Sequence, residues 1–427
     1  MAEIRPFKGL LYNKRKIGDY SKVVAPPYDV IPENMRDKLY EKDENNIIRL
    51  ILGKSFDSDN QRENKYTRAK KFLNEWLKEK IFVKDDAESF YLYAQEYDHK
   101  GKKCKRLGFM GLMRIGEKGE DAVLPHENTL SKPKEDRMNL IKQVESNLSP
   151  IFTLYDDKEN VIRGALEKKT SESAPVIDIT VDGVRHKLWK FREEDALKKI
   201  IKRMNGKNVF IADGHHRYEV ARMYRDMCRK KNGYNGNADY VMMYFTDMAD
   251  ENDLTVMATH RVIKMMPSED DKELISRLSE YFIITDCKDL FHLMKGLEEE
   301  SDKGYAFGFL INGRYFLLKP KEKEALLGLI REEKPKEWKE LDVSILHSAI
   351  FKRILSVSDA EGNITYVRDA ENAEALIKDG SHMAAFLLNP TRVEQLKAVA
   401  ELGEMMPQKS TYFYPKLLTG LVMNKFN

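Results

Sequence analysis

The stretch Val209-Phe-Ile-Ala-Asp-Gly-His-His-Arg-Tyr-Glu-Val220 decides the fold, because an apolar run stops abruptly at a polar turn. Residues 209–212 form a short apolar run that is typical of a buried strand, and Gly214 permits a sharp turn. Tyr218 and Ala221 then match the start of a partly buried helix. The stretch therefore predicts a strand, a tight turn and a helix.

The turn between that strand and that helix carries groups that suit phosphate binding. The N–H groups and the positive dipole end of a helix N-terminus favour an anion, and Arg217 adds a bidentate charged donor. We therefore predict that Gly214, His215, His216 and Arg217 bind nucleotide phosphates and that Asp213 contacts Mg²⁺. The alternative is a polar turn with structural histidines, in which Asp213 caps the helix.

A second alternative for the same turn is a transition-metal site. His215 and Glu219 lie four residues apart, on one face of a helix, and Asp213 could complete the ligand set. This alternative predicts a metal-dependent hydrolase.

Two other polar clusters interrupt apolar runs. If His126-Glu127 meets the Asp213 turn in space, Glu127 is a carboxylate beside a phosphate site, able to take a proton from an attacking hydroxyl. Otherwise Glu127 is a surface residue that caps the following helix. The segment Lys409-Ser410-Thr411 combines a cation with two hydroxyls and could bind a carboxylate or a phosphate. Asp29 and the pair His260-Arg261 are weaker candidates.

Composition limits the class of protein. The chain has 427 residues, of which 42% are hydrophobic, so we expect two or three folded domains rather than disorder. Lys+Arg 73 against Asp+Glu 70 leaves a net charge of only +3, which argues against a dedicated nucleic-acid binder. No apolar stretch approaches a membrane span and the N-terminus lacks a secretory segment, so we expect no membrane partner and a cytoplasmic location. The three cysteines are widely spaced and are interpreted as structural thiols.

Helical and strand-like patterns alternate along the chain, which predicts an α/β or α+β protein with a mixed sheet. The pairs Asp182-Gly183 and Asn312-Gly313, each between two apolar runs, predict β-hairpins. Residues 255–262 are predicted to complete the first sheet. We expect a first domain over residues 1–265, and a second α/β lobe over residues 266–427 whose segment near 405–420 returns to the active site.

Six motifs, in order along almost the whole chain, resemble one bacterial and archaeal family, long catalogued as domain of unknown function number one thousand and fifteen. They are Ala25-Pro-Pro-Tyr-Asp-Val30, Leu124-Pro-His-Glu-Asn-Thr129, Asn147-Leu-Ser-Pro-Ile-Phe152, Phe210-Ile-Ala-Asp-Gly-His-His-Arg-Tyr218, Thr259-His-Arg-Val262 and Lys409-Ser-Thr-Tyr-Phe-Tyr-Pro415.

Two of these motifs, Pro125-His-Glu127 and Ile211-Ala-Asp-Gly-His-His-Arg217, are also similar to the active-site signatures of free-serine kinases in the ParB/sulfiredoxin superfamily. The resemblance implies a ParB/sulfiredoxin-like nucleotide-binding core with large insertions. It implies His126 and Glu127 as catalytic residues, with Glu127 as the base, and Asp213 near Mg²⁺. It further implies phosphates on His215, His216 and Arg217, and a substrate contact at Lys409, Ser410 and Thr411.

The predicted function is Mg²⁺-dependent transfer of a phosphoryl group from ATP or ADP to the hydroxyl of free L-serine, giving O-phosphoserine. The same superfamily includes DNA-partitioning proteins that use a nucleotide as a conformational switch. A nucleotide-binding regulatory module without kinase activity is therefore the alternative, against which the near-neutral charge and the lack of a clear helix-turn-helix pattern argue.

Overall fold

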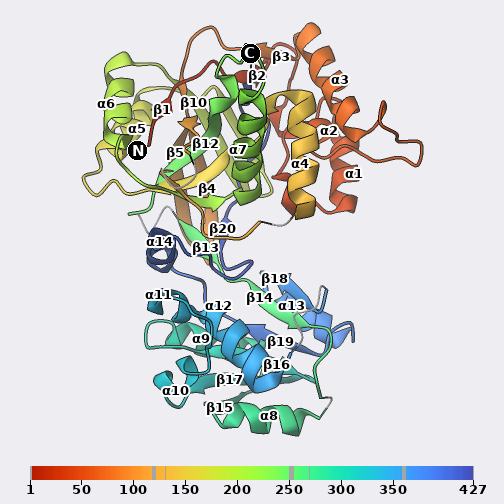
Figure 1. Ribbon diagram of the computed structural model, residues 1–427, viewed down its shortest axis with the longest axis vertical. Coiled ribbons are helices and arrows are strands. Elements are labelled where there is room, and N and C mark those ends of the chain that lie inside the picture. The colour runs from red at the N-terminus through yellow and green to blue at the C-terminus, as the bar shows by residue number, and fades with distance from the viewer. Residues whose placement is uncertain are drawn as a thin grey trace. The chain divides into compact units, whose positions relative to one another are not determined.

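The computed structural model describes residues 2–117, 122–129, 131–249, 254–268, 270–357 and 362–426. The chain divides into two compact units, shown in Figure 1. Unit 1 comprises residues 1–125, 129–255 and 415–427, and unit 2 comprises residues 126–128 and 256–414. The chain thus passes between the units four times, so residues far apart in the sequence share one unit.

The described residues of unit 1 form a nine-stranded mixed sheet. Its order is β6-β11-β8-β12-β5-β4-β10-β9, with β1 beside β5. Strand β8 runs parallel to β12, and β6 runs parallel to β11, whereas the other pairs are antiparallel. The strands are β1 Ile4–Arg5, β4 Phe90–His99, β5 Lys102–Arg114, β6 Val123–Leu124, β8 Ile151–Tyr155, β9 Ile177–Val181, β10 Val184–Phe191, β11 Val209–Asp213 and β12 Tyr240–Asp247.

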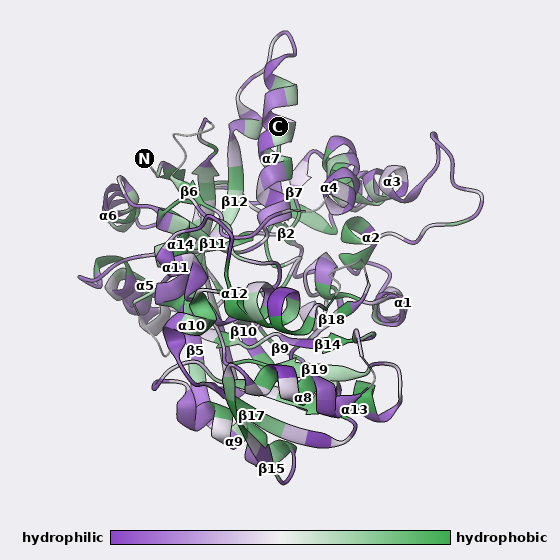
Figure 2. Cartoon of the chain, turned by 60° about the horizontal axis from the view of Figure 1, so that its bottom comes forward, coloured by the Kyte–Doolittle hydropathy of each residue, from purple (hydrophilic) through white to green (hydrophobic). Residues whose placement is uncertain are grey.

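Helices cover this sheet and build the rest of unit 1. They are η1 Tyr20–Lys22, η2 Tyr28–Val30, α1 Glu33–Lys42, α2 Ile48–Ile51, α3 Lys65–Lys78, α4 Ser131–Val144, α5 Val161–Glu172, α6 Glu194–Met204, α7 His215–Arg229 and η3 Asn237–Asp239. Two small sheets, β2 Leu10–Tyr12 with β3 Phe82–Lys84 and β7 Ser146–Asn147 with β21 Asn424–Lys425, complete the unit. Bands of hydrophilic and hydrophobic residues alternate along α7 in Figure 2, as a helix with one buried face requires.

The core of unit 1 is a close-packed aromatic and aliphatic cluster on the sheet. Phe109 of β5 is fully buried between Phe90 and Phe245, whose ring centroids lie 5.0 Å and 5.1 Å away. Ile162 of α5 and Met204 of α6 pack into the same cluster. Because each apolar side chain that leaves water stabilises the fold by roughly 1.5–3 kcal/mol, this cluster fixes the sheet on which the strand ends are displayed.

Unit 2 is built on a six-stranded sheet in the order β15-β17-β16-β19-β14-β18. Its strands are β14 His260–Ile263, β15 Phe282–Cys287, β16 Phe307–Ile311, β17 Arg314–Pro320, β18 Ile364–Val367 and β19 Ala384–Leu387, while β13 Thr255–Met257 pairs with β20 Tyr412–Tyr414. Its helices are α8 Asp271–Ser279, α9 Leu290–Glu300, α10 Lys323–Leu327, α11 Lys336–Lys339, α12 Asp342–Ser344, α13 Ala370–Lys378 and α14 Val393–Glu401, together with a π-helix, η4, over Ile345–Leu355. The two units together confirm the predicted α/β class with a mixed sheet.

Both predicted hairpins form where the turn residues require them. Asp182 and Gly183 have φ values of 48° and 78°, and Asn312 and Gly313 have 48° and 74°. Two successive left-handed residues give the type I′ twist that suits a two-residue hairpin, and Asp-Gly and Asn-Gly are the pairs that tolerate it.

The prediction for residues 255–262 is wrong. Strand β14 pairs with β18 and β19 in the sheet of unit 2 rather than extending the first sheet. Its apolar pattern fits any buried strand, and only the long-range partners decide which sheet it joins. Among the described residues, none of the helices combines the length and the apolar character that crossing a membrane demands.

Candidate functional site

The Asp213 turn, residues 213–217, lies where β11 ends and α7 begins. The pairing of β11 with β8 shifts register between Ile211 and Asp213, and such a bulge re-aims the side chain that follows it. Gly214 then adopts a φ of 98°, and a Cβ at that position would lie 2.9 Å from the guanidinium of Arg217. Position 214 therefore requires glycine for two reasons: its left-handed backbone angle and the close approach of the Arg217 guanidinium.

Three charged side chains of unit 1 gather at the Asp213 turn. Arg217 Nη2 donates to Asp213 Oδ2 at 3.3 Å, and its Nη1 donates to the carbonyl of Pro150. Lys416 Nζ lies 3.5 Å from the same Asp213 oxygen. Two cations thus face one carboxylate at the N-terminus of a 15-residue helix. The net charge and the helix dipole both favour an anion beside this turn.

A buried network brings Lys416 to the turn. Arg106, which is fully buried and lies 4.5 Å over the Phe152 ring, donates to the carbonyl of Pro415 and to the Gln95 side chain. Gln95 Nε2 in turn donates to the Lys416 carbonyl at 2.9 Å. Lys416 is not among the residues predicted from the sequence, although a cation directly after the Lys409–Pro415 motif was a usable signal.

The residues of the metal-site alternative do not come together. The Glu219 carboxylate accepts from the Thr129 hydroxyl at 2.7 Å and pairs with Lys134 at 3.0 Å. Burial alone raises the pKa of Glu219, but the Thr129 and Lys134 contacts outweigh it and hold that pKa below its usual value. In the described part of the chain, no three His, Cys, Asp or Glu side chains are placed to share a metal ion. His215 is buried in the first turn of α7, and Asp29 is exposed in η2.

A small cavity of about 70 Å³ lies beside Arg217 in unit 1. Tyr28, Asn147 and Ser149 line it, so three of the six motifs meet at this point. Arg137, which also lines it, lies 4.0 Å over the Tyr28 ring. Burial raises the pKa of Tyr28 to about 12, so the phenol stays protonated as a donor. The cavity has room for a small polar group or a few waters, not for a nucleoside.

The Glu127 cluster, which comprises His126, Glu127, Lys409, Ser410 and Thr411, lies in unit 2. His126 is fully buried and its Nε2 lies 3.0 Å from Thr411 Oγ1. The Met406 N–H donates to the His126 carbonyl at 2.7 Å, and Glu127 forms a parallel bridge with Met406. Two segments 279 to 285 residues apart are therefore held side by side.

The predicted substrate residues have unequal exposure. Lys409 is exposed and has a left-handed φ of 56°. Ser410 is buried, its hydroxyl donates to the Pro407 carbonyl, and its own carbonyl accepts from Thr391 Oγ1 at 2.8 Å. The hydroxyls of this segment are thus used in shaping its turn, and Lys409 is the group that it presents to solvent.

Arg261, a weaker candidate in the sequence, organises this cluster. Its buried guanidinium donates from Nη2 to the Gln408 and Lys409 carbonyls, each at 3.2 Å, and from Nε to His347 Nε2 at 3.2 Å. Burial lowers the pKa of Arg261 to about 10, an effect partly offset by Tyr366 and Glu127. Arg261 therefore remains a cation at neutral pH and attracts the Glu127 carboxylate.

His260, a weaker candidate, has a structural contact. Its Nδ1 accepts from the Leu388 N–H at 3.2 Å, and burial lowers its pKa to about 4. A neutral imidazole that accepts from the backbone anchors β14 beside the end of β19.

The structure thus divides the predicted site residues between the units. Unit 1 holds Asp213, Gly214, His215, His216 and Arg217, whereas unit 2 holds His126, Glu127, Lys409, Ser410 and Thr411.

The contacts of Asp213 decide whether it can hold the predicted Mg²⁺. Asp213 supplies one carboxylate, and Arg217 and Lys416 already lie beside its Oδ2. This donor set does not suit a bare Mg²⁺, which requires near-octahedral oxygen coordination. It fits a Mg²⁺ that arrives with nucleotide phosphates and water, for which Asp213 would be the protein ligand.

Residues 4–344 match the profile of a family described as "Protein of unknown function (DUF1015)", which confirms the family resemblance carried by the six motifs. No curated protein matches the chain.

Solved structures resemble the chain only distantly. A free serine kinase mutant in complex with AMP is 15% identical, with a TM-score of 0.35 over 69% of this chain and 84% of that chain. A conserved hypothetical protein from Pyrococcus furiosus is 16% identical, with a TM-score of 0.33 over 70% and 89%. C-terminally truncated SbnI from Staphylococcus aureus is 12% identical, with a TM-score of 0.36 over 73% and 85%. At such TM-scores the function has to be argued from the chain's own residues.

Proposed function

We propose that this chain, which belongs to the family described as Protein of unknown function (DUF1015), is a Mg²⁺-dependent kinase for a small hydroxyl compound. The phosphoryl donor is ATP or ADP, and the acceptor with which to begin is free L-serine, giving O-phosphoserine.

The observation that carries this proposal is the Asp213 turn. Arg217 and Lys416 flank one carboxylate at the N-terminus of α7, and Gly214 leaves the room that the guanidinium occupies. Phosphoryl transfer depends mainly on positioning and on neutralising the oxygens of the transferred group. A turn with two cations, a helix dipole and one carboxylate supplies these components. Bound Mg²⁺ would add charge neutralisation at the phosphates, with Asp213 as its protein ligand.

Glu127 is proposed as the base that activates the acceptor. It lies in unit 2 next to the buried His126, whose contact with Thr411 fixes the segment. The buried guanidinium of Arg261 interacts electrostatically with Glu127. A carboxylate can accept the proton of a substrate hydroxyl.

In the proposed reaction, the acceptor hydroxyl oxygen forms a bond to the terminal phosphorus of the nucleotide. The bond from that phosphorus to the bridging oxygen breaks. The nucleoside diphosphate (from ATP) or monophosphate (from ADP) leaves with the electron pair. The hydroxyl proton passes to Glu127. No net oxidation occurs, and the products are a phosphomonoester and the shortened nucleotide.

The choice of L-serine follows from the similarity of Pro125-His-Glu127 and Ile211–Arg217 to the free-serine kinase signatures. The turn would bind phosphates through its charge and helix dipole. Both ATP and ADP carry such phosphates, so the two nucleotides are tested side by side.

The test is to incubate the full-length protein with Mg²⁺, ATP or ADP and a panel of hydroxyl compounds headed by L-serine. Mass spectrometry then detects a gain of phosphate in the acceptor and a matching loss in the nucleotide. We expect a phosphorylated acceptor that forms only when Mg²⁺ and the nucleotide are both present. Omission of the protein and addition of EDTA serve as controls.

Two outcomes separate the proposal from its rival. If the protein binds nucleotide but no hydroxyl compound gains phosphate, the kinase assignment fails and a nucleotide-binding regulatory module remains. If nucleotide loses phosphate to water alone, the protein is a nucleotide hydrolase.

A further inference from the structure

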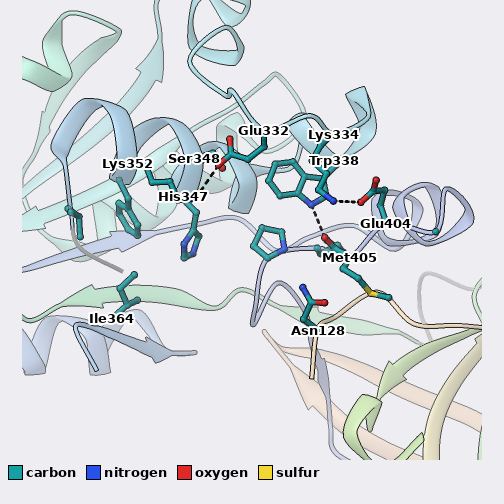
Figure 3. Close-up of a pocket in the computed structure, with 15 residues that line it drawn as sticks. Asn128, Glu332, Lys334, Trp338, His347, Ser348, Lys352, Ile364, Glu404 and Met405 are labelled. Atoms are coloured by element: carbon teal, nitrogen blue, oxygen red, sulfur yellow. Dashed lines mark hydrogen bonds and ion pairs between the residues drawn. The ribbon is translucent and has the colours of Figure 1, made fainter. Parts of the chain in front are cut away.

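A cavity of about 490 Å³ lies within unit 2, beside the Glu127 cluster (Figure 3). Asn128, which directly follows Glu127, forms part of its wall. Met406, the bridge partner of Glu127, and Pro407, which accepts from Ser410, form another part. The cavity therefore shares two wall segments with the predicted base and the predicted substrate turn.

The π-helix η4 supplies the polar face of this cavity. With i→i+5 hydrogen bonding, His347 and Lys352 fall one turn apart on the same face. Burial lowers the pKa of His347 to about 3, so its ring is neutral at physiological pH. Because Nε2 accepts from Arg261, the single ring proton resides on Nδ1. The cavity is thus lined by a neutral imidazole whose donor is Nδ1–H.

Charges of both signs line the cavity. Lys334 Nζ lies 2.6 Å from Glu404, and Lys352 Nζ lies 3.1 Å from Glu332. These four side chains are 24–47% exposed, and ion pairs at such sites contribute only about 0–1 kcal/mol. Such pairs can open at small cost, which would make a glutamate available to an ammonium group and a lysine available to a carboxylate group.

Apolar side chains also line the cavity. Trp338 is held in place by donating from Nε1 to the Met405 carbonyl at 2.8 Å, and Phe351 packs edge-on against His347. Figure 3 shows Trp338, His347 and Asn128 among the side chains around the cavity. The volume falls in the range of sites for ligands larger than serine.

We propose that this cavity binds the acceptor, and that the acceptor is a zwitterionic amino acid whose side chain can be longer than that of serine. The inference rests on the proposed function and names the substrate class of the same reaction. The ammonium group would pair with Glu404 and the carboxylate group with Lys334. The apolar part would contact Trp338, and the hydroxyl would be directed toward Asn128 and Met406, which are the chain neighbour and the bridge partner of Glu127.

Trp338 provides a readout that does not depend on catalysis. The other two tryptophans, Trp76 and Trp189, are buried in unit 1 and give a constant background. We expect L-serine, L-homoserine or L-tyrosine to change the tryptophan emission saturably in wild type, with L-tyrosine read at an excitation wavelength that it does not absorb. N-acetyl-L-serine and L-serinamide, which each lack one charge of the zwitterion, should give no change at the same concentration.

The Trp338→Phe variant tests whether the cavity is the origin of the signal. The change should vanish in this variant, because the reporting ring is gone. A change that persists there, equal binding of the capped analogues, or no change with any amino acid would overturn the inference.

Charge variants test the pairing. The double variant Lys334→Met with Glu404→Gln should weaken amino-acid binding about tenfold or more, since a lost charge-assisted hydrogen bond is worth roughly 1.5–3 kcal/mol. Lys336→Met, an exposed position on the neighbouring helix α11, is the matched control and should bind as wild type does.

Turnover separates this inference from the proposed function. If amino acids bind in the cavity but gain no phosphate with any nucleotide, the kinase proposal fails and the cavity is an amino-acid site with another role. If the double variant phosphorylates its acceptor with an unchanged KM, the cavity inference fails and the kinase proposal stands.

Discussion

The Asp213 turn and the Glu127 cluster are built by different means. The Asp213 turn is determined over nine residues, by an apolar strand, a glycine with a φ of 98° and the first turn of α7. The Glu127 cluster brings together segments that lie up to 285 residues apart, and its centre is the buried guanidinium of Arg261. The first is a local structure to which Pro150 and Lys416 add long-range contacts, whereas the second exists only once unit 2 has folded.

This difference has a physical consequence. A local turn retains its shape as long as its backbone angles are retained. A cluster held by long-range hydrogen bonds depends on buried charged groups whose loss leaves partners unsatisfied. Substitutions should therefore act locally on the Asp213 turn and through the fold on the Glu127 cluster.

The largest effect should come from Glu127→Gln. The amide is nearly isosteric but cannot accept the hydroxyl proton, so we expect kcat to fall by about 10²–10⁴-fold, the usual contribution of a general base. Nucleotide affinity, measured by calorimetry, should not change, because the Asp213 turn is intact.

The matched control for that prediction is Glu401→Gln, an exposed carboxylate at the end of α14. It should turn over as wild type does. Full activity of the Glu127→Gln variant would show that Glu127 is not the base. Of the two regions, only the Asp213 turn would then keep its proposed function.

The next effect in size concerns Arg261. Replacement by Met removes donors to the Gln408 and Lys409 carbonyls and to His347, so we expect a loss of about 3 kcal/mol or more in the free energy of unfolding of the protein. Chemical denaturation measures this loss. Arg353→Met, at an exposed position of η4, is the control. Equal stability of the two variants would show that Arg261 does not hold the cluster together.

A smaller effect is expected at the Asp213 turn from Gly214→Ala. A left-handed alanine costs roughly 1–2 kcal/mol, and its Cβ would also lie 2.9 Å from the Arg217 guanidinium. Gly183→Ala is a matched control, since its φ is 78° and nothing lies within 4 Å of the added Cβ. Both variants should lose similar stability, and only Gly214→Ala should lose nucleotide affinity. A loss of affinity in Gly183→Ala would contradict the local origin of the effect.

The sequence predicted what local chemistry determines. The hairpin turns at Asp182-Gly183 and Asn312-Gly313 and the boundary between β11 and α7 follow from residues within a few positions. The six motifs in their order also indicated the family, whereas no single motif was sufficient for that. What decides the fold at these positions is a backbone angle or a periodicity, and both can be read directly from the residues.

Other features have no local signal. The apolar run of β14 fits either sheet, and its partners β18 and β19 lie about a hundred residues later in the chain. Lys416 reaches Asp213 only because Arg106 and Gln95 hold the backbone of residues 415–416. Burial of Arg261 likewise depends on the complete fold of unit 2. Long-range contacts of this kind could not be inferred from spacing.

The smallest effect tests the neutral imidazole of the cavity. The pKa of His347 is about 3 in the folded protein and about 6.5 in an unfolded chain, so the unfolded state binds more protons between these values. The stabilising contribution of the neutral ring is therefore complete above pH 6.5 and is lost as the pH falls. Gln at this position can still accept from Arg261 but cannot titrate. We expect His347→Gln to destabilise the protein at pH 7. Its loss of unfolding free energy relative to wild type should be about 2 kcal/mol smaller at pH 5, because wild type alone loses the contribution of the neutral ring; urea unfolding at both pH values measures this. A deficit that stays constant between pH 7 and pH 5 would mean that the ring of His347 is not held neutral by burial. Nδ1–H would then not be the donor that the cavity wall presents, and burial would not distinguish the Glu127 cluster from the Asp213 turn in this respect.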